Sequence, residues 1–237
     1  MPAPNTVSVK VWADLACFTR PENKVERVSY DVMTPSAARG VLEGILWKPE
    51  MRYCIREIWV LNPIRRFSIV RNEVQSVTVP KTVRKWASEG GNFQADENRT
   101  QRHSLVLRDV AYIIKAEIEL MPRASDPLQK YLEMFTRRVE KGQAHRMPYL
   151  GNREFSAFFA PPDGTEQAIP EDNELGRMLF DLDFEAQKKG GVTFKQHTAN
   201  GSAWVDGVAK PRFFRAKLEQ GILHVPPELY APANRGA

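Results

Sequence analysis

The alternation of hydrophobic and polar positions predicts a strand at residues 6–13, near the start of the chain. Thr34-Pro35 then predicts the start of a helix, because threonine is a good N-cap and proline is favoured at the first helical position. Pro49 forces the preceding residue toward extended geometry, so this helix should end near Trp47. Its apolar stripe consists of Ala38, Val41, Leu42 and Ile45.

Asp126-Pro127 predicts a second helix by the same capping argument, and Gly142 is well placed to end it. The apolar stripe of this helix consists of Leu128, Tyr131, Leu132, Phe135 and Val139. Polar, glycine-containing residues 86–103 predict an exposed loop. Further extended segments are predicted at 51–62, 66–80, 104–121 and 153–160.

This order of elements, β-α-β-β-α-β, predicts an α+β fold with a ferredoxin-like N-terminal domain over residues 1–162, carrying an insertion around 65–103. A linker is expected from 160 to about 173. Residues 174–237 should form a smaller antiparallel β-sheet domain, in which Glu219-Gln220-Gly221 turns the last two strands into a hairpin. The short strands expected there are 177–184, 192–198, 202–205, 212–218 and 222–225.

Composition narrows the class of protein. The 237 residues, 42% of them hydrophobic, are enough to bury a substantial core, which argues against global disorder. No apolar run approaches the roughly 18 residues of a membrane span, and the N-terminus does not have the pattern of a secretory signal. Cys17 and Cys54 are isolated thiols, which excludes a disulfide framework and favours a cytoplasmic location.

Charge is distributed unevenly along the chain, although the net value is only +5. Residues 52–85 contain eight basic and two acidic side chains, and residues 123–153 contain seven basic and three acidic ones. Residues 163–185 reverse this balance, with eight acidic side chains and Arg177. Such segregation suits contact with a polyanion, so nucleic acid is a candidate partner, and a solvated surface of ordinary charge is the alternative.

Candidate catalytic groups are few. The four histidines, His103, His145, His197 and His224, lack metal-ligand spacing, so no metal or other cofactor is expected. Asp181, Asp183 and Glu185 alternate with apolar residues and would share one face of a strand. A divalent-metal nuclease centre there is one interpretation, and an acidic face in water is the alternative that the alternation alone explains.

Several strings of residues resemble the type I-C (Dvulg) branch of the CRISPR-associated Cas family five, within the RAMP superfamily. The resemblance spans residues 7 to about 184, in order and without rearrangement. The matching strings are Val11-Trp12-Ala13-Asp14, Cys17-Phe18-Thr19-Arg20-Pro21-Glu22, Lys24-Val25-Glu26-Arg27-Val28-Ser29-Tyr30, Met33-Thr34-Pro35-Ser36-Ala37-Ala38-Arg39-Gly40, Trp47-Lys48-Pro49, Arg71-Asn72-Glu73-Val74, Arg137-Arg138, Gly142-Gln143 and Pro148-Tyr149-Leu150-Gly151-Asn152-Arg153-Glu154-Phe155.

The resemblance implies a ferredoxin-like domain related to RNA-recognition folds, followed by a smaller β-sheet domain. It implies an endoribonuclease that cleaves the repeat hairpin of precursor CRISPR RNA without metal. The 2′-hydroxyl would attack the phosphate, and the protein would stay on the 5′ handle within a type I-C surveillance complex. It further implies partner subunits in that complex. Separately, the basic surface makes duplex DNA a candidate partner, and the lack of an apolar span makes a membrane an unexpected one.

The resemblance also implies catalytic positions, and this chain departs from them. Family members place a tyrosine or histidine just before Trp-Lys-Pro, where this chain has Leu46, and a Lys-His pair at the second helix, where it has Lys130-Tyr131. Lys130 suits stabilisation of the phosphate, and Tyr131 is either catalytic or a core residue. Substitutes for the missing acid-base group are Tyr30, Tyr53, Tyr149 and His145.

RNA binding does not depend on those positions, because cations in or beside the matching strings can hold phosphates. Trp47 and Phe18 are candidates for stacking on bases. One alternative to the nuclease is a subunit that holds the 5′ handle without cutting, and another is a metal-dependent or DNA-binding role. The candidate RNA-binding residues are Arg20, Lys24, Arg27, Arg39, Lys48, Arg137, Arg138, His145 and Arg153.

Overall fold

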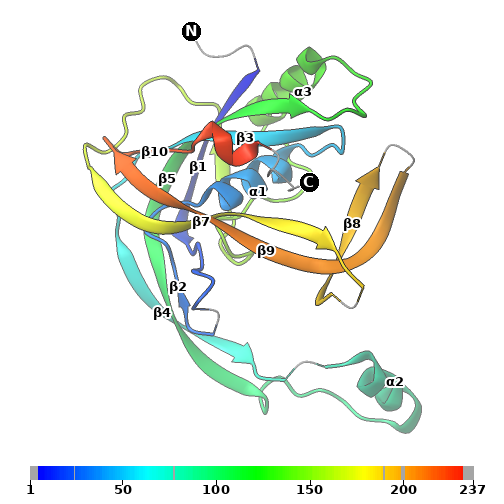
Figure 1. Cartoon of the computed structure of the whole chain (residues 1–237). Coiled ribbons are helices and arrows are strands. Elements are labelled where there is room, and N and C mark those ends of the chain that lie inside the picture. The colour runs from blue at the N-terminus through cyan, green and yellow to red at the C-terminus, as the bar shows by residue number, and fades with distance from the viewer. Residues whose placement is uncertain (1–4, 24, 77, 189, 199–200, 232–237) are drawn as a thin grey trace.

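The computed structural model describes residues 5–23, 25–76, 78–188, 190–198 and 201–231. Within them the chain forms an α+β fold built on one mostly antiparallel sheet of ten strands (Figure 1). The main path across the sheet is β6-β1-β5-β3-β10-β9-β7, with β2 and β4 paired to β5 and β8 paired to β9. The strands are β1 (Thr6–Ala16), β2 (Arg27–Val28), β3 (Met51–Val60), β4 (Arg66–Val74), β5 (Arg99–Leu120), β6 (Phe158–Ala160), β7 (Asn173–Ala186), β8 (Val192–Thr198), β9 (Gly201–Glu219) and β10 (Ile222–His224).

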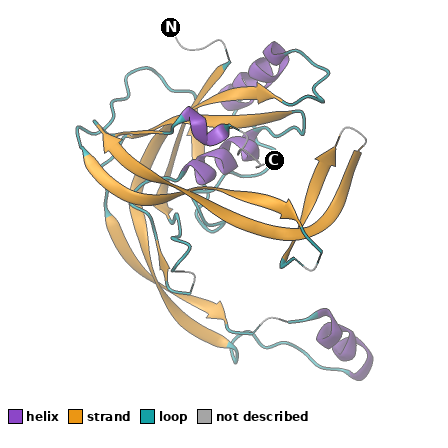
Figure 2. Ribbon diagram, in the orientation of Figure 1, coloured by secondary structure: helices purple, strands orange, loops and turns teal. Residues whose placement is uncertain are grey.

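Two helices pack against this sheet and supply much of the core (Figure 2). Helix α1 (Pro35–Ile45) begins as predicted, with the Thr34 side chain accepting a hydrogen bond from the Ala37 amide at 3.3 Å. Helix α3 (Leu128–Glu140) begins one residue later than the predicted cap, after Pro127, and buries Tyr131, Phe135 and Val139. Asp126 does not cap this helix; its carboxylate accepts a hydrogen bond from the Lys130 Nζ and forms an ion pair with it.

Strand β5 connects the centre of the sheet to a projecting arm. Its later part pairs with β1 and β3, and its first residues pair with β4, out to Val74↔Arg99. Asp109 lies where the pairing changes partner, and its backbone φ of 54° is in the left-handed region. Such a residue bends a strand, and here it directs β4 and the start of β5 away from the main sheet, as Figure 1 shows.

The end of the arm corrects one prediction. Residues 80–89 form helix α2 (Pro80–Glu89), where the second half was expected to be loop and the first residue still strand. Pro80 at the first helical position and Gly90 just after the last residue are ordinary helix boundaries. Helix α2 contains no buried residue, although Val83, Trp86 and Ala87 share one face at helical spacing; the polar, glycine-containing stretch after Lys85 concealed this pattern.

The C-terminal strands continue the same sheet. The predicted hairpin at Gln220-Gly221 is confirmed, with φ of 47° and 73° at these two residues, and β10 then pairs with β3. Strand β9 is one long strand, where two short ones were expected. Gly207 and Pro211 interrupt the sequence pattern, yet β7 and β8 pair with β9 from its two sides and keep it extended. The short helix η1 (Pro227–Tyr230) ends the described chain.

Helix α1 is tied to β7 by an ion pair. The Arg39 Nε and Nη2 atoms donate to the two Asp181 oxygens at 2.9 and 2.7 Å, and Nη1 donates to Glu43 at 2.7 Å. Burial alone would lower the pKa of Arg39, but the charges of Asp181 and Glu43 outweigh it and raise that pKa. A two-pronged guanidinium–carboxylate contact of this kind fixes orientation as well as distance.

We therefore expect Arg39→Ala to lower the free energy of unfolding by about 1–3 kcal/mol, because Asp181 would keep its partly buried charge without a partner. Arg65→Ala, which breaks an exposed pair with Asp109, should cost less than about 1 kcal/mol. Urea unfolding followed by circular dichroism measures both. Equal losses in the two variants would show that the partial burial of the Arg39 pair adds nothing.

Candidate active site

The loop between α1 and β3 presents an aromatic ring and a cation to solvent. Leu46, the residue at the family's tyrosine or histidine position, is 1% exposed and packs in the core. Its carbonyl accepts a hydrogen bond from the Tyr53 hydroxyl at 2.9 Å. Because Leu46 points inward, Trp47 and Lys48 emerge on the outside, with Trp47 43% exposed.

The start of α3 lies against this loop. Lys130 is exposed, and its Nζ donates to Asp126 at 2.8 Å; this hydrogen bond raises the pKa of Lys130. Tyr131 is 2% exposed, and burial raises its pKa, with Glu50 and Asp126 adding to the effect. Glu50 acts electrostatically on both residues, which places the loop after α1 beside the first turn of α3.

Arg123 connects strand β8 to the loop between α1 and β3. Its Nε donates to the Pro49 carbonyl and its Nη1 to the His197 carbonyl, each at 2.6 Å. The His197 ring then lies 5.5 Å from the Trp47 ring, centroid to centroid. Strand β8 thus reaches the loop after α1, and neither Arg123 nor His197 was among the predicted site residues. His197 has no ligand spacing in the sequence, and Arg123 is one cation in a basic stretch.

The other end of α3 gathers several predicted RNA-binding residues near the end of α1. Arg138 Nη1 donates to the Ile45 carbonyl at 2.6 Å, and the His145 backbone amide donates to the same oxygen at 3.3 Å. The side chains of Arg137 and His145 are exposed, as is that of Arg153 farther along. These positions leave the exposed side chains accessible to a bound polyanion.

The remaining predicted RNA-binding residues are engaged within the protein. The Arg20 guanidinium lies 4.5 Å from the centre of the Tyr30 ring, and Arg27 pairs with Glu154 at 3.1 Å and Glu73 at 3.4 Å. Arg39 holds Asp181, as described above. Lys24 lies outside the described residues. RNA contact by Arg20, Arg27 and Arg39 remains a prediction, and it would require these side chains to exchange partners.

The two basic stretches differ in how far they are neutralised. In the first, five arginines are paired with carboxylates, three of which lie on β5. These pairs are Arg52–Glu119, Arg56–Glu117, Arg65–Asp109, Arg66–Asp31 and Arg71–Glu73. In the second, the exposed residues Arg137, Lys141, Arg146 and Arg153 form no ion pair with a described residue. We define the first three, which lie in or after the last turn of α3, as the α3-end cations. The end of α3 is therefore one region of unneutralised positive charge; Lys81 and Arg84 of the first stretch, on α2, likewise form no ion pair with a described residue.

Two of the substitutes suggested for the missing acid-base group are buried. The Tyr53 hydroxyl donates to Leu46, and the Tyr30 hydroxyl accepts from the Leu179 amide at 3.2 Å. Burial raises the pKa of both phenols. They are poor candidates for proton transfer to a bound RNA, whereas Tyr149 and His145 are exposed.

The acidic side chains of β7 form ion pairs with basic side chains of the protein. Asp183 pairs with Arg212 at 3.5 Å and Glu185 with Lys210 at 2.6 Å, in addition to the Asp181–Arg39 pair. Among the residues that the structure describes, no group of three or more histidine, cysteine, aspartate or glutamate side chains is arranged to hold a metal ion. The geometry favours the interpretation of an ion-paired strand over that of a metal centre.

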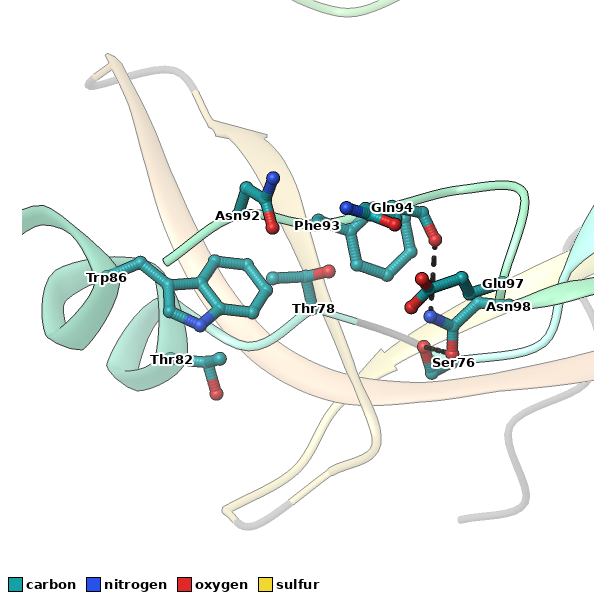
Figure 3. Close-up of a pocket in the computed structure, with 9 residues that line it drawn as sticks. All are labelled: Ser76, Thr78, Thr82, Trp86, Asn92, Phe93, Gln94, Glu97 and Asn98. Atoms are coloured by element: carbon teal, nitrogen blue, oxygen red, sulfur yellow. Dashed lines mark hydrogen bonds between the residues drawn. The ribbon is translucent and has the colours of Figure 1, made fainter. Parts of the chain in front are cut away.

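The arm carries a separate hollow of about 360 Å³ (Figure 3). The Trp86 and Phe93 rings line it with their centroids 6.4 Å apart. Asn98 accepts a hydrogen bond from the Ser76 hydroxyl at 3.1 Å and donates to the Gln94 carbonyl at 3.4 Å. Helix α2 stands at the far end of the arm from α3 in Figure 1, so this hollow is not part of the Lys130 site.

Known proteins resemble the chain over nearly its whole length. A CRISPR pre-crRNA endoribonuclease Cas5d of Thermus thermophilus is 50% identical over 230 residues, covering 97% of this chain and 95% of that protein. A protein of the same name from Mannheimia succiniciproducens is 39% identical over 236 residues, with 94% and 96% covered. No helix within the described residues is long and apolar enough to cross a membrane.

Solved structures share the fold. A functionally uncharacterized protein from Streptococcus mutans superposes with a TM-score of 0.62 at 19% identity, covering 95% of this chain and 94% of that one. A second structure, titled as a CRISPR-associated protein, gives the same TM-score and identity. A family model described as CRISPR-associated protein (Cas_Cas5) matches residues 6–226. The chain belongs to the Cas5 family of CRISPR-associated proteins, in its type I-C branch.

Proposed function

We propose that this protein is an endoribonuclease that cleaves the repeat hairpin of precursor CRISPR RNA and then stays on the 5′ handle of the product. The observation that carries the proposal is the 50% identity, over 97% of the chain, to a relative named as a pre-crRNA endoribonuclease. The exposed Lys130, in the first turn of α3 beside the loop that carries Trp47 and Lys48, supports it chemically.

The cleavage we propose needs no metal. The 2′-hydroxyl oxygen of the RNA forms a bond to the adjacent phosphorus, the bond from phosphorus to the 5′ oxygen breaks, and a 2′,3′-cyclic phosphate and a 5′-hydroxyl result. One group must accept the 2′ proton and another must protonate the 5′ oxygen, while a cation stabilises the crowded phosphate. Lys130 is the cation: a lysine side chain is charged at neutral pH, and its Nζ exchanges the Asp126 carboxylate for the phosphate.

Tyr131 has a narrower role in this mechanism. Burial raises the pKa of its phenol, so the hydroxyl keeps its proton at neutral pH and cannot act as a base. It can still donate a hydrogen bond at the core side of the site. The absence of an imidazole here is the main difference from the pattern that the family resemblance implies.

The finer features of the fold belong to the same proposal. The order β6-β1-β5-β3, with α1 and α3 connecting its strands, supports a ferredoxin-like unit over residues 1–162. Residues 174–237 would form its smaller β-rich partner, joined to it through β10. We place the protein in the cytoplasm, among the other subunits of a type I-C surveillance complex, with duplex DNA as a secondary partner.

A second candidate function is that of a handle-binding subunit without cleavage. The observation in its favour is that Leu46 and Tyr131, at two positions of the family's acid-base groups, are both buried in the core. In that case the RNA would still bind through the α3-end cations, and the phosphate would remain intact.

We expect Lys130→Ala to slow cleavage of the host's repeat RNA by about 10²–10³-fold in excess EDTA, because the phosphate loses its cation. Lys85→Ala is the matched control, because Lys85, on α2, also forms an exposed ion pair with a carboxylate four residues away, that of Glu89. Single-turnover rates on denaturing gels measure both. A substrate with hydrogen in place of the 2′-hydroxyl should not be cut; tight binding without any cut by the unaltered protein would select the second function.

We also expect the combined variant Arg137→Ala, Arg146→Ala, Arg153→Ala to weaken RNA binding strongly at low salt. Each lost phosphate contact should reduce the slope of log K against log salt concentration by about 0.7–0.9. The control, Arg52→Ala, Arg65→Ala, Arg66→Ala, removes the same charge from arginines that already have carboxylate partners. Filter binding across a salt series measures both, and equal losses would mean that unpaired charge does not define the RNA surface.

A further inference from the structure

The proposed reaction lacks a proton-transfer group at the positions where the family has one, because Leu46 is apolar and Tyr131 keeps its proton. An exposed imidazole near Lys130 would remedy this, since histidine is the side chain that most readily exchanges protons near neutral pH. The described part of the chain contains four histidines, and their placement distinguishes them.

His197 is the histidine whose ring contacts the loop that carries the site. Its ring centroid lies 5.5 Å from that of Trp47, the residue immediately after Leu46, with the planes tilted by 56°. Trp47 is 43% exposed, and His197 is half-buried, so the imidazole stands at the surface beside it. His103 lies on the arm and His224 on β10, opposite Glu57, so neither reaches this loop. His145 follows the far end of α3 and meets the end of α1 through its backbone amide, which donates to the Ile45 carbonyl at 3.3 Å.

The position of His197 is held by the backbone. Arg123 donates to the His197 carbonyl and to the Pro49 carbonyl with two arms of one guanidinium, each at 2.6 Å. Strand β8 is itself held by β9, with His197 opposite Ser202. Arg123 precedes Asp126, whose carboxylate holds Lys130, so the segment from 123 to 130 connects the backbone of His197 to the phosphate-binding cation.

We propose that His197 is a catalytic residue of this nuclease, exchanging a proton with the RNA while Trp47 supports its ring. This inference rests on the proposed endoribonuclease function. The imidazole accepts the proton of the attacking 2′-hydroxyl or delivers one to the departing 5′ oxygen, and water returns it to its starting state after release of product. The β8–β9 hairpin thus provides, from the C-terminal part of the chain, a group that α1 and α3 lack.

The test separates proton transfer from packing. His197→Phe keeps an aromatic ring against Trp47 and removes both ring nitrogens, and His103→Phe, on the exposed arm, is the matched control. In excess EDTA, His197→Phe should bind repeat RNA as the unaltered protein does and cleave it about 10²–10⁴-fold more slowly. Circular dichroism and melting temperature show whether each variant folds.

Chemical rescue provides the second measurement. Imidazole added to His197→Ala should restore cleavage in a saturable manner, whereas the same imidazole should not restore Lys130→Ala. A His197→Phe variant that cleaves at the unaltered rate, or a folded His197→Ala variant that imidazole does not rescue, overturns the proposal. If the unaltered protein itself does not cut, the endoribonuclease function fails instead, and the two failures are thereby distinguished.

Discussion

The burial of the apolar faces of α1 and α3 against the β1–β5–β3 part of the sheet positions the candidate active site. Ile45 and Leu46 end α1 inside the core, so the chain must turn outward at Trp47. On α3, Tyr131 points into the same core, and successive helical residues are about 100° apart, so Lys130 faces solvent. The hydrophobic effect thus buries Leu46 and Tyr131, and this burial leaves the adjacent side chains of Trp47, Lys48 and Lys130 exposed to solvent.

Electrostatic pairing then decides where the basic surface lies. The arginines on β3 and β4 face glutamates and aspartates of adjacent strands or loops, and such pairs leave little net field. Around the end of α3 the cations have no such partners among the described residues, and their charge is available to a polyanion. A net charge of only +5 therefore coexists with a concentrated positive region, because neutralisation is local and depends on which strands are neighbours.

The continuity of the sheet brings the C-terminal strands to this site. Strand β10 pairs with β3, β9 pairs with β10, and β8 pairs with β9, so the placement of His197 follows from a chain of backbone hydrogen bonds. The Arg39–Asp181 pair fixes β7 against α1, and the Arg123 contacts fix β8 against the loop after α1. Two arginines that sequence patterns would assign to RNA or to the surface thus hold the C-terminal strands near the candidate active site.

The sequence by itself determined the elements whose patterns are local: Thr34-Pro35 at the start of α1, the buried stripes of both core helices, strands β1 and β8, and the hairpin at Gln220-Gly221. Helix α2 was not predicted because its second half was assigned to the polar, glycine-containing loop at 86–103. Strand β9 was divided because Gly207 and Pro211 are tolerated within a strand only when neighbouring strands supply pairing. Only the tertiary structure decided which cations are neutralised and that His197 meets Trp47. The physical reason is that these contacts join residues up to 150 positions apart, and no local periodicity carries information about them.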